Sequence, residues 1–128
     1  MERILLVDDE KDLINIFQKM LSGLGYRVTS TLNSIDALEI FKARPEEFDA
    51  VITDMTMPQQ IGTELARRIK QIRADIPIIL STGYSDLVDE QKAREVGIQA
   101  FLMKPVGREM LSKTLRRLLD EKEGLTQN

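Results

Sequence analysis

The stretch Ile-Leu-Leu-Val-Asp-Asp-Glu at residues 4–10 decides how the rest of the chain is interpreted. Four apolar residues run directly into three acidic ones. An apolar run without polar alternation is typical of a strand that is covered on both faces of a sheet. Neighbouring carboxylates repel one another, so the acidic cluster must lie in bulk water, cap a helix or hold a cation.

Similar short runs of apolar or β-branched residues recur along the chain, and each is followed by a helical pattern. The segments 78–80 and 100–103 lack polar alternation, as 4–7 does, and are also predicted to be covered on both faces. The five predicted strands are Arg3–Val7, Arg27–Thr31, Ala50–Thr53, Ile78–Ser81 and Gln99–Met103.

The intervening segments carry apolar residues at the three- and four-residue spacing of amphipathic helices. The first helix is predicted to end near Gly25, and the second to begin with Ser34 as its N-cap. The fourth is predicted from about Asp86 to Gly97, and the fifth from about Gly107 to Glu121. The residues predicted to face the core are Leu13, Ile14, Phe17, Leu21, Leu24, Ala37, Leu38, Phe41, Ile61, Leu65, Ile69, Ile72, Leu87, Ala93, Val96, Met110, Leu111, Thr114, Leu115 and Leu118.

Alternation of strand and helix predicts an α/β fold, a doubly wound parallel sheet with helices on both faces. Several strand orders are compatible with five (βα) units, and the flavodoxin-like order 2-1-3-4-5 is a common one. In that order, ligands bind outside the carboxyl ends of the strands, at the crevice between the first and third strands. We expect the domain to span residues 1–121, with 122–128 as a C-terminal tail or the start of a linker.

Composition excludes several classes of function. The chain has 128 residues, a formal net charge of −3 and neither cysteine nor histidine. These absences argue against disulfides, zinc sites and Ser-His-Asp catalysis. The net charge argues against a nucleic-acid surface, and no apolar run approaches the roughly 20 residues that span a bilayer. We therefore expect a cytoplasmic protein that contacts neither nucleic acid nor membrane.

Polar residues follow the predicted strands at the edge where ligands are expected. Asp8 and Asp9 follow the first strand, Asp54 the third, Thr82 the fourth and Lys104 the fifth. Hard oxygen ligands around a small open site suit Mg²⁺. An ammonium and a hydroxyl suit the oxygens of a phosphoryl group. Together they predict a site for a cation and a phosphoryl group.

Each of these residues also has a purely structural interpretation. Asp9 or Glu10 would be favourable at the positive N-terminus of the first helix. Asp54 would serve as a turn residue, Thr82 as an ordinary residue at a strand end and Lys104 as a surface lysine. Their joint placement at the same end of four strands is what favours a functional site.

Four motifs carry a resemblance to a known family: VDD at residues 7–9, DMTMPQQIG at 54–62, STG at 81–83 and KP at 104–105. With this spacing, the chain resembles the receiver domain of two-component response regulators from about Arg3 to Leu119. The resemblance implies that Asp54 accepts a phosphoryl group from a phosphohistidine. It further implies a sensor histidine kinase or histidine phosphotransfer protein as donor.

The resemblance also implies a Mg²⁺ site. Asp9 and Asp54 would bind the ion directly, with the backbone carbonyl of Thr56 as a third ligand. Asp8 would act mainly through a bound water.

The remaining implied roles concern the phosphoryl group and the conformational switch. Thr82 and Lys104 would hold the phosphoryl oxygens, and Phe101 would turn inward when Thr82 moves toward the phosphate. The Lys104-Pro105 peptide bond is expected to be cis. The domain would catalyse only its own phosphorylation and dephosphorylation.

The output of the domain stays open at this point. A downstream protein or a linked output domain would recognise the face formed by the fourth helix, fifth strand and fifth helix, and phosphorylation could also drive dimerisation there. The chain would be either a stand-alone regulator or a receiver from a larger protein, such as a hybrid histidine kinase.

Three rival classes fit the sequence less well. A phosphatase of the haloacid dehalogenase type needs a second Asp where this chain has Thr56. A nucleotide-binding module needs a glycine- or hydroxyl-rich loop after the first strand, where the acidic run 8–12 would repel an anion. A degenerate receiver acting only as a scaffold would not need the acids, Thr82 and Lys104.

Overall fold

A computed structural model of the chain describes residues 2–55, 61–83 and 90–127. Its strands pair in parallel in the order β2-β1-β3-β4-β5, which confirms the predicted flavodoxin-like topology. The elements are β1 (Arg3–Val7), α1 (Lys11–Gly23), β2 (Arg27–Thr31), α2 (Ser34–Ala43), a 3-10 turn (Pro45–Glu47), β3 (Ala50–Asp54), α3 (Gly62–Ile72), β4 (Ile78–Thr82), α4 (Glu90–Glu95), β5 (Ala100–Met103) and α5 (Arg108–Gln127).

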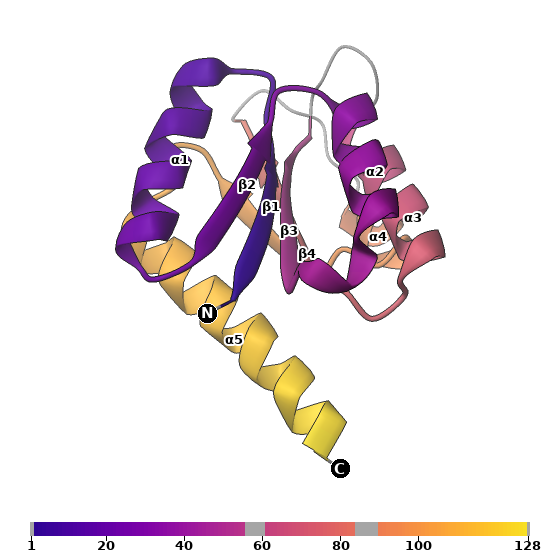
Figure 1. Ribbon diagram of the computed structural model, residues 1–128. Helices are drawn as coiled ribbons and strands as arrows, with labels where there is room; N and C mark the ends of the chain where they lie inside the picture. The colour runs from indigo at the N-terminus through magenta and orange to yellow at the C-terminus, as the bar shows by residue number, and fades with distance from the viewer. Residues whose placement is uncertain (1, 56–60, 84–89, 128) are drawn as a thin grey trace.

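The helices form two layers around the sheet. Helices α1 and α5 cover one face and α2, α3 and α4 cover the other, as Figure 1 shows. The carboxyl-terminal part of α5 extends past the sheet (Figure 1). This helix is longer than predicted, because its backbone continues to Gln127 and not only to about Glu121.

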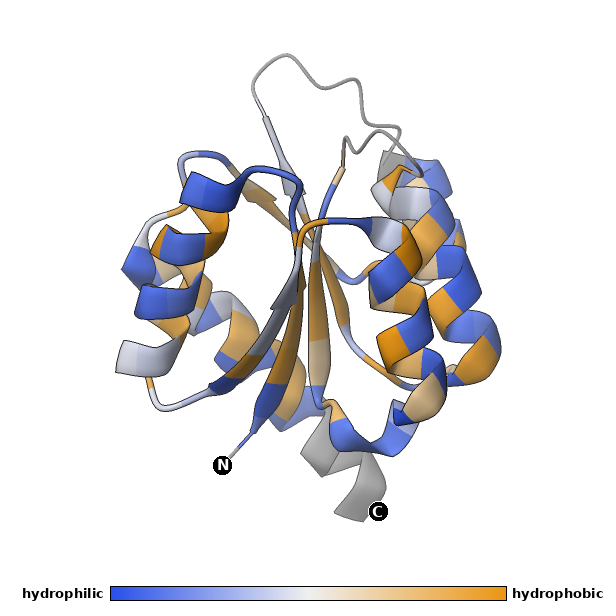
Figure 2. Cartoon of the chain, turned by 45° about the horizontal axis from the view of Figure 1, so that its top comes forward, coloured by the Kyte–Doolittle hydropathy of each residue, from blue (hydrophilic) through white to orange (hydrophobic). Residues whose placement is uncertain are grey.

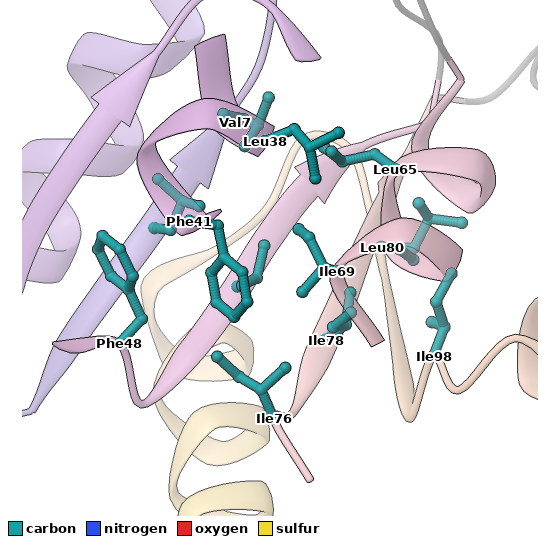
Figure 3. Packing of buried hydrophobic residues seen from close by; sticks show 14 of the residues in the cluster. Val7, Leu38, Phe41, Phe48, Leu65, Ile69, Ile76, Ile78, Leu80 and Ile98 are labelled. Atoms are coloured by element: carbon teal, nitrogen blue, oxygen red, sulfur yellow. The ribbon is translucent and has the colours of Figure 1, made fainter. Parts of the chain in front are cut away.

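Each helical layer forms its own apolar core against the sheet. The apolar sides of the helices face the strands and their polar sides face outward (Figure 2). On the α2–α3–α4 side, α2 contributes Leu38 and Phe41 and α3 contributes Leu65 and Ile69 to one continuous cluster (Figure 3). The second cluster, on the α1–α5 side, includes Phe17 and Leu21 from α1 and Leu111, Leu115 and Leu118 from α5.

Several residues predicted to face the core lie at the surface instead. Ile61, Ile72 and Met110 are 48%, 37% and 59% exposed. Ile61 and Ile72 lie at the two ends of α3 and Met110 lies in the first turn of α5, where helical periodicity continues but the sheet no longer covers the side chain. Met103, the last residue of β5, is also exposed and Phe101 is only half-buried, so the prediction that 100–103 is covered on both faces was wrong at these two residues.

The helix boundaries show one further correction. Asn33, and not Ser34, is the N-cap of α2, and its side-chain oxygen accepts a hydrogen bond from the backbone N–H of Asp36 at 2.8 Å. Gly25 and Gly97, the predicted terminators of α1 and α4, both have positive φ values, which favour glycine. The predicted start of α4 at Asp86 and the core position Leu87 lie outside the described residues.

Strands β3 and β4 each run one residue further than predicted, so that Asp54 and Thr82 are their last residues. Both side chains therefore stand at the carboxyl edge of the sheet on a regular, hydrogen-bonded backbone. Within the described parts of the chain, no helix is long and apolar enough to cross a membrane.

Candidate functional site

Asp54 is at the centre of the site. It ends β3, which lies between β1 and β4 in the middle of the sheet, and it is only 3% exposed. A buried carboxylate is costly unless it is paired with a positive group. The group that pairs with Asp54 therefore indicates what chemistry the site can perform.

Lys104 supplies that pairing from the residue that follows β5. Its Nζ donates a hydrogen bond to Asp54 Oδ1 at 2.8 Å and lies 3.3 Å from Asp8 Oδ2. The backbone N–H of Lys104 donates to the carbonyl of Thr82 at 2.8 Å, and the Lys104-Pro105 bond is cis, as predicted. One ammonium thus joins the ends of β1 and β3 from the far side of β4.

Burial dominates the electrostatics of Asp54. It raises the pKa of this carboxyl to about 6, against the hydrogen bond from Lys104, which lowers it, while the charge of Asp8 raises it further. For Lys104, burial alone lowers the pKa, but the hydrogen bond to Asp54 and the charges of Asp8 and Asp54 outweigh it and leave the pKa raised. The ammonium therefore stays charged at neutral pH.

The acidic residues after β1 form a compact group. Carboxylate oxygens of Asp8, Asp9 and Glu10 lie within 4.8 Å of one another, with Asp8 buried and the other two exposed. The side chain of Glu10, the N-cap residue of α1, makes no capping hydrogen bond. Asp8 Oδ1 accepts from the backbone N–H of Glu10 at 2.9 Å, which holds the turn. Helix capping by Glu10 therefore does not account for this concentration of charge.

Gly62 contributes to the shape of the site, a role that was not predicted from the sequence. Its N–H donates to the carbonyl of Met55 at 2.8 Å, so the start of α3 packs directly on the end of β3. A β-carbon at this position would overlap the backbone carbonyl oxygen of Asp54 and come within 2.7 Å of Leu80. Only glycine allows α3 to approach Asp54 this closely. Its place in the motif 54–62 was a signal, but the close approach is visible only in three dimensions.

The remaining predicted residues are placed as follows. Thr82 is 7% exposed, and its hydroxyl makes a weak contact of 3.9 Å with the sulfur of Met103. Phe101 is half-buried, and the guanidinium carbon of Arg94 lies 5.4 Å from the centre of its ring. The sequence did not suggest this cation–π contact. Thr56, predicted as a metal ligand through its backbone, lies outside the described residues.

Comparison with known proteins identifies the class. Residues 4–116 match the model of the response regulator receiver domain family. The chain is similar to a response regulator receiver domain protein from Clostridium thermocellum, with a TM-score of 0.92, 32% identity and coverage of 98% and 99% of the two chains. It is also similar to a CheY-like receiver domain protein from Methanospirillum hungatei, with a TM-score of 0.88, 30% identity and coverage of 97% and 98%.

Two curated proteins show the setting in which such a domain occurs. The transcriptional regulatory protein ZraR of Klebsiella oxytoca is 36% identical over 91% of this chain and 26% of its own length. The response regulator SaeR of Staphylococcus epidermidis is 32% identical over 89% of this chain and 49% of its own length. The chain thus spans about a quarter to a half of these relatives.

The fold, the edge residues and these matches define a CheY-like receiver domain of the two-component type. The chain belongs to the response regulator receiver domain family.

Proposed function

We propose that Asp54 is the phosphoacceptor of a Mg²⁺-dependent transfer from a phosphohistidine. The observation that carries this proposal is the buried Asp54 carboxylate, held at 2.8 Å by the Lys104 ammonium at the carboxyl end of the central strand. A carboxylate is a modest nucleophile, so the transfer depends on positioning and on neutralising the phosphoryl oxygens.

The proposed transfer replaces one bond to phosphorus by another. An Asp54 oxygen forms a bond to phosphorus as the bond from phosphorus to the donor imidazole breaks. The imidazole nitrogen keeps the electron pair of that bond, and Asp54 becomes an acyl phosphate. Lys104 then has a phosphoryl oxygen beside it in place of the free carboxylate, and Thr82 is proposed to donate its hydroxyl to another oxygen.

The acidic group after β1 supports a Mg²⁺ site. Asp8, Asp9 and Glu10 offer carboxylate oxygens within 4.8 Å of one another, and Lys104 offsets only one of the charges gathered around it. Hard oxygen ligands and an open, solvent-facing side are what Mg²⁺ prefers. Asp9, Asp54 and the Thr56 carbonyl are the proposed direct ligands, with Asp8 bound through water. When bound, the ion would neutralise phosphoryl charge together with Lys104.

The proposed partners follow from the chemistry. With no histidine of its own, the chain needs a phosphohistidine from a histidine kinase or histidine phosphotransfer protein. Its signal would pass through the α4–β5–α5 face, where Phe101 is the proposed switch, to a downstream protein or linked domain. We further propose a cytoplasmic location, no direct contact with nucleic acid or membrane, and no catalysis beyond the domain's own phosphorylation and dephosphorylation.

Intact-mass measurement tests the proposal. Acetyl phosphate with Mg²⁺ is expected to add one phosphoryl group to the wild type and none to Asp54→Asn or to wild type in EDTA. Full incorporation into Asp54→Asn would refute the assignment of the acceptor.

A further inference from the structure

Ser81 is a buried polar residue that the transfer chemistry above does not use. It is 1% exposed, and its hydroxyl has no hydrogen-bond partner within the described parts of the chain. A buried hydroxyl left unpaired costs about 1–3 kcal/mol. Such a group in a folded protein calls for an explanation, and function is one of the few available.

The sheet register places Ser81 directly beside the proposed phosphoacceptor. Ser81 on β4 is the cross-strand partner of Asp54 on β3. Side chains at paired positions of adjacent strands point to the same face, and neighbouring strands lie about 4.8 Å apart. That separation allows a serine and an aspartate side chain to meet through one hydrogen bond or one water.

The ion pair between Lys104 and Asp54 spans the end of β4, the strand that carries Ser81. Strand β4 lies between β3 and β5 in the sheet. The bond from Lys104, which follows β5, to Asp54, at the end of β3, must therefore pass over the end of β4. Ser81 lies at that end, one residue before Thr82, with its backbone carbonyl accepting from the N–H of Met55 at 2.9 Å.

Lys104 donates a hydrogen bond to one oxygen of the Asp54 carboxylate, Oδ1. We propose that Ser81 is a positioning residue for Asp54. Its hydroxyl, which makes no direct hydrogen bond to Asp54, donates one through a bridging water and so keeps the carboxylate in the orientation from which it attacks phosphorus. This inference rests on the proposed function of Asp54 as acceptor.

The variant Ser81→Ala separates this role from a purely structural one. If the Ser81 hydroxyl makes no hydrogen bond, Ser81→Ala leaves the unfolding midpoint unchanged or raises it; if it bonds toward Asp54, the same change lowers the midpoint. If the hydroxyl orients Asp54, the same change also lowers the rate of phosphorylation at saturating acetyl phosphate and Mg²⁺ by about fivefold, equivalent to about 1 kcal/mol. The KM for acetyl phosphate stays unchanged, because Ser81 does not contact the donor.

Two further variants complete the experiment. Ser34→Ala is the matched control, because Ser34 is also fully buried with an unpaired hydroxyl but lies at the start of α2, outside the register of Asp54. We expect it to react at the wild-type rate. Ser81→Thr keeps the hydroxyl and is expected to restore most of the rate.

The outcomes are distinct. Slow reaction of Ser81→Ala alone, with recovery in Ser81→Thr, supports the proposal. Equal rates for wild type and Ser81→Ala overturn the role of Ser81 and leave Asp54 as acceptor. No phosphorylation of the wild type would overturn the proposed function and, with it, the role of Ser81.

Discussion

Lys104 Nζ lies 2.8 Å from Asp54 Oδ1 and 3.3 Å from Asp8 Oδ2, so a single ammonium joins two buried carboxylates, one at the end of β3 and one directly after β1. A buried charge pair of this kind contributes little to stability on balance, because desolvation offsets the attraction. Its value lies in holding a positive charge where a phosphoryl group would be transferred.

Removing this ammonium is expected to slow phosphorylation strongly. Lys104→Met keeps the length and apolar stem of the side chain but leaves Asp54 without its hydrogen-bond donor. We expect the rate with acetyl phosphate to fall by about 100-fold, the usual effect of deleting one electrostatic contact to a transition state. Lys104→Arg, which keeps the charge with a different shape, is expected to retain more activity. A Lys104→Met protein that stays folded and reacts within twofold of the wild type would exclude this role.

The raised pKa of Asp54 predicts how stability depends on pH in the absence of Mg²⁺. The pKa of Asp54 is about 6 in the folded protein, against the ordinary value of 3.8 for an aspartate. Between these values the folded state binds more protons than the unfolded state, so this group's contribution to stability decreases as pH rises from about 4 to 6. Above about pH 6 the ionised Asp54 destabilises the apo fold.

Asp54→Asn removes that dependence. In EDTA, the unfolding free energy of Asp54→Asn relative to the wild type should therefore increase by about 2 kcal/mol between about pH 4 and pH 7. Urea unfolding at several pH values, followed by circular dichroism, measures it. Carboxylates that do not interact with Asp54 cancel in the difference. A difference that is flat or decreases with pH would show that Lys104 outweighs burial and that the pKa of Asp54 is not raised.

Variants of Asp9 and Glu10 distinguish the loss of a metal ligand from the loss of negative charge alone. Both are exposed members of the acidic group, and each carries one negative charge. Asp9→Asn should weaken Mg²⁺ binding by at least about 10- to 100-fold, because this is the usual loss when even a group that only orients a ligand is removed, and Asp9 is a proposed direct ligand. Glu10→Gln removes the same charge but no proposed ligand, and should weaken binding much less. Calorimetric titration with Mg²⁺ compares the two.

Asp9→Asn also tests the structural interpretation of the cluster. Because close carboxylates repel without a cation, Asp9→Asn is expected to leave the melting temperature of the apo protein unchanged or raised. A clear drop in that temperature would instead indicate that Asp9 stabilises the N-terminus of α1.

Gly62 is expected to be far less tolerant of substitution than another glycine in a helix. In Gly62→Ala the new methyl group overlaps the Asp54 carbonyl and the Leu80 side chain, and overpacking of this kind costs about 1–3 kcal/mol. Gly23→Ala is the control, since a β-carbon there meets only the end of the Arg108 side chain at 3.4 Å. Equal unfolding free energies for the two variants would contradict the close approach of α3 to β3.

The sequence was most informative where the physical signal is local. Strands β1 and β2 have the predicted bounds, and the glycines after α1 and α4 mark the helix ends. It was misleading at positions such as Ile72 and Met110, since periodicity does not tell how far the sheet covers a helix. Asn33 and Ser34 are both good N-caps, and only the backbone geometry distinguishes them.

The candidate site, like the fold, could be predicted from the sequence only in part. Parallel topology alone was sufficient to bring Asp8, Asp54 and Lys104 to one edge of the sheet, and the structure places all three there. The roles of Gly62 and Ser81 could not be predicted in this way. They depend on which atoms meet across the β3–α3 and β3–β4 contacts. The motif at 54–62 marked Gly62, but neither the motif nor the residue types show which atoms these two residues meet.

The most direct test is the chemical position of the phosphoryl group. Borohydride reduces an acyl phosphate to an alcohol, so a phosphorylated aspartate becomes homoserine and is found by peptide mass spectrometry. After treatment with acetyl phosphate and Mg²⁺, followed by borohydride, homoserine is expected at position 54 and not at positions 8 or 9. Homoserine at position 8 or 9, or a phosphoryl group that borohydride does not convert, would contradict the assignment of Asp54 as the phosphoacceptor.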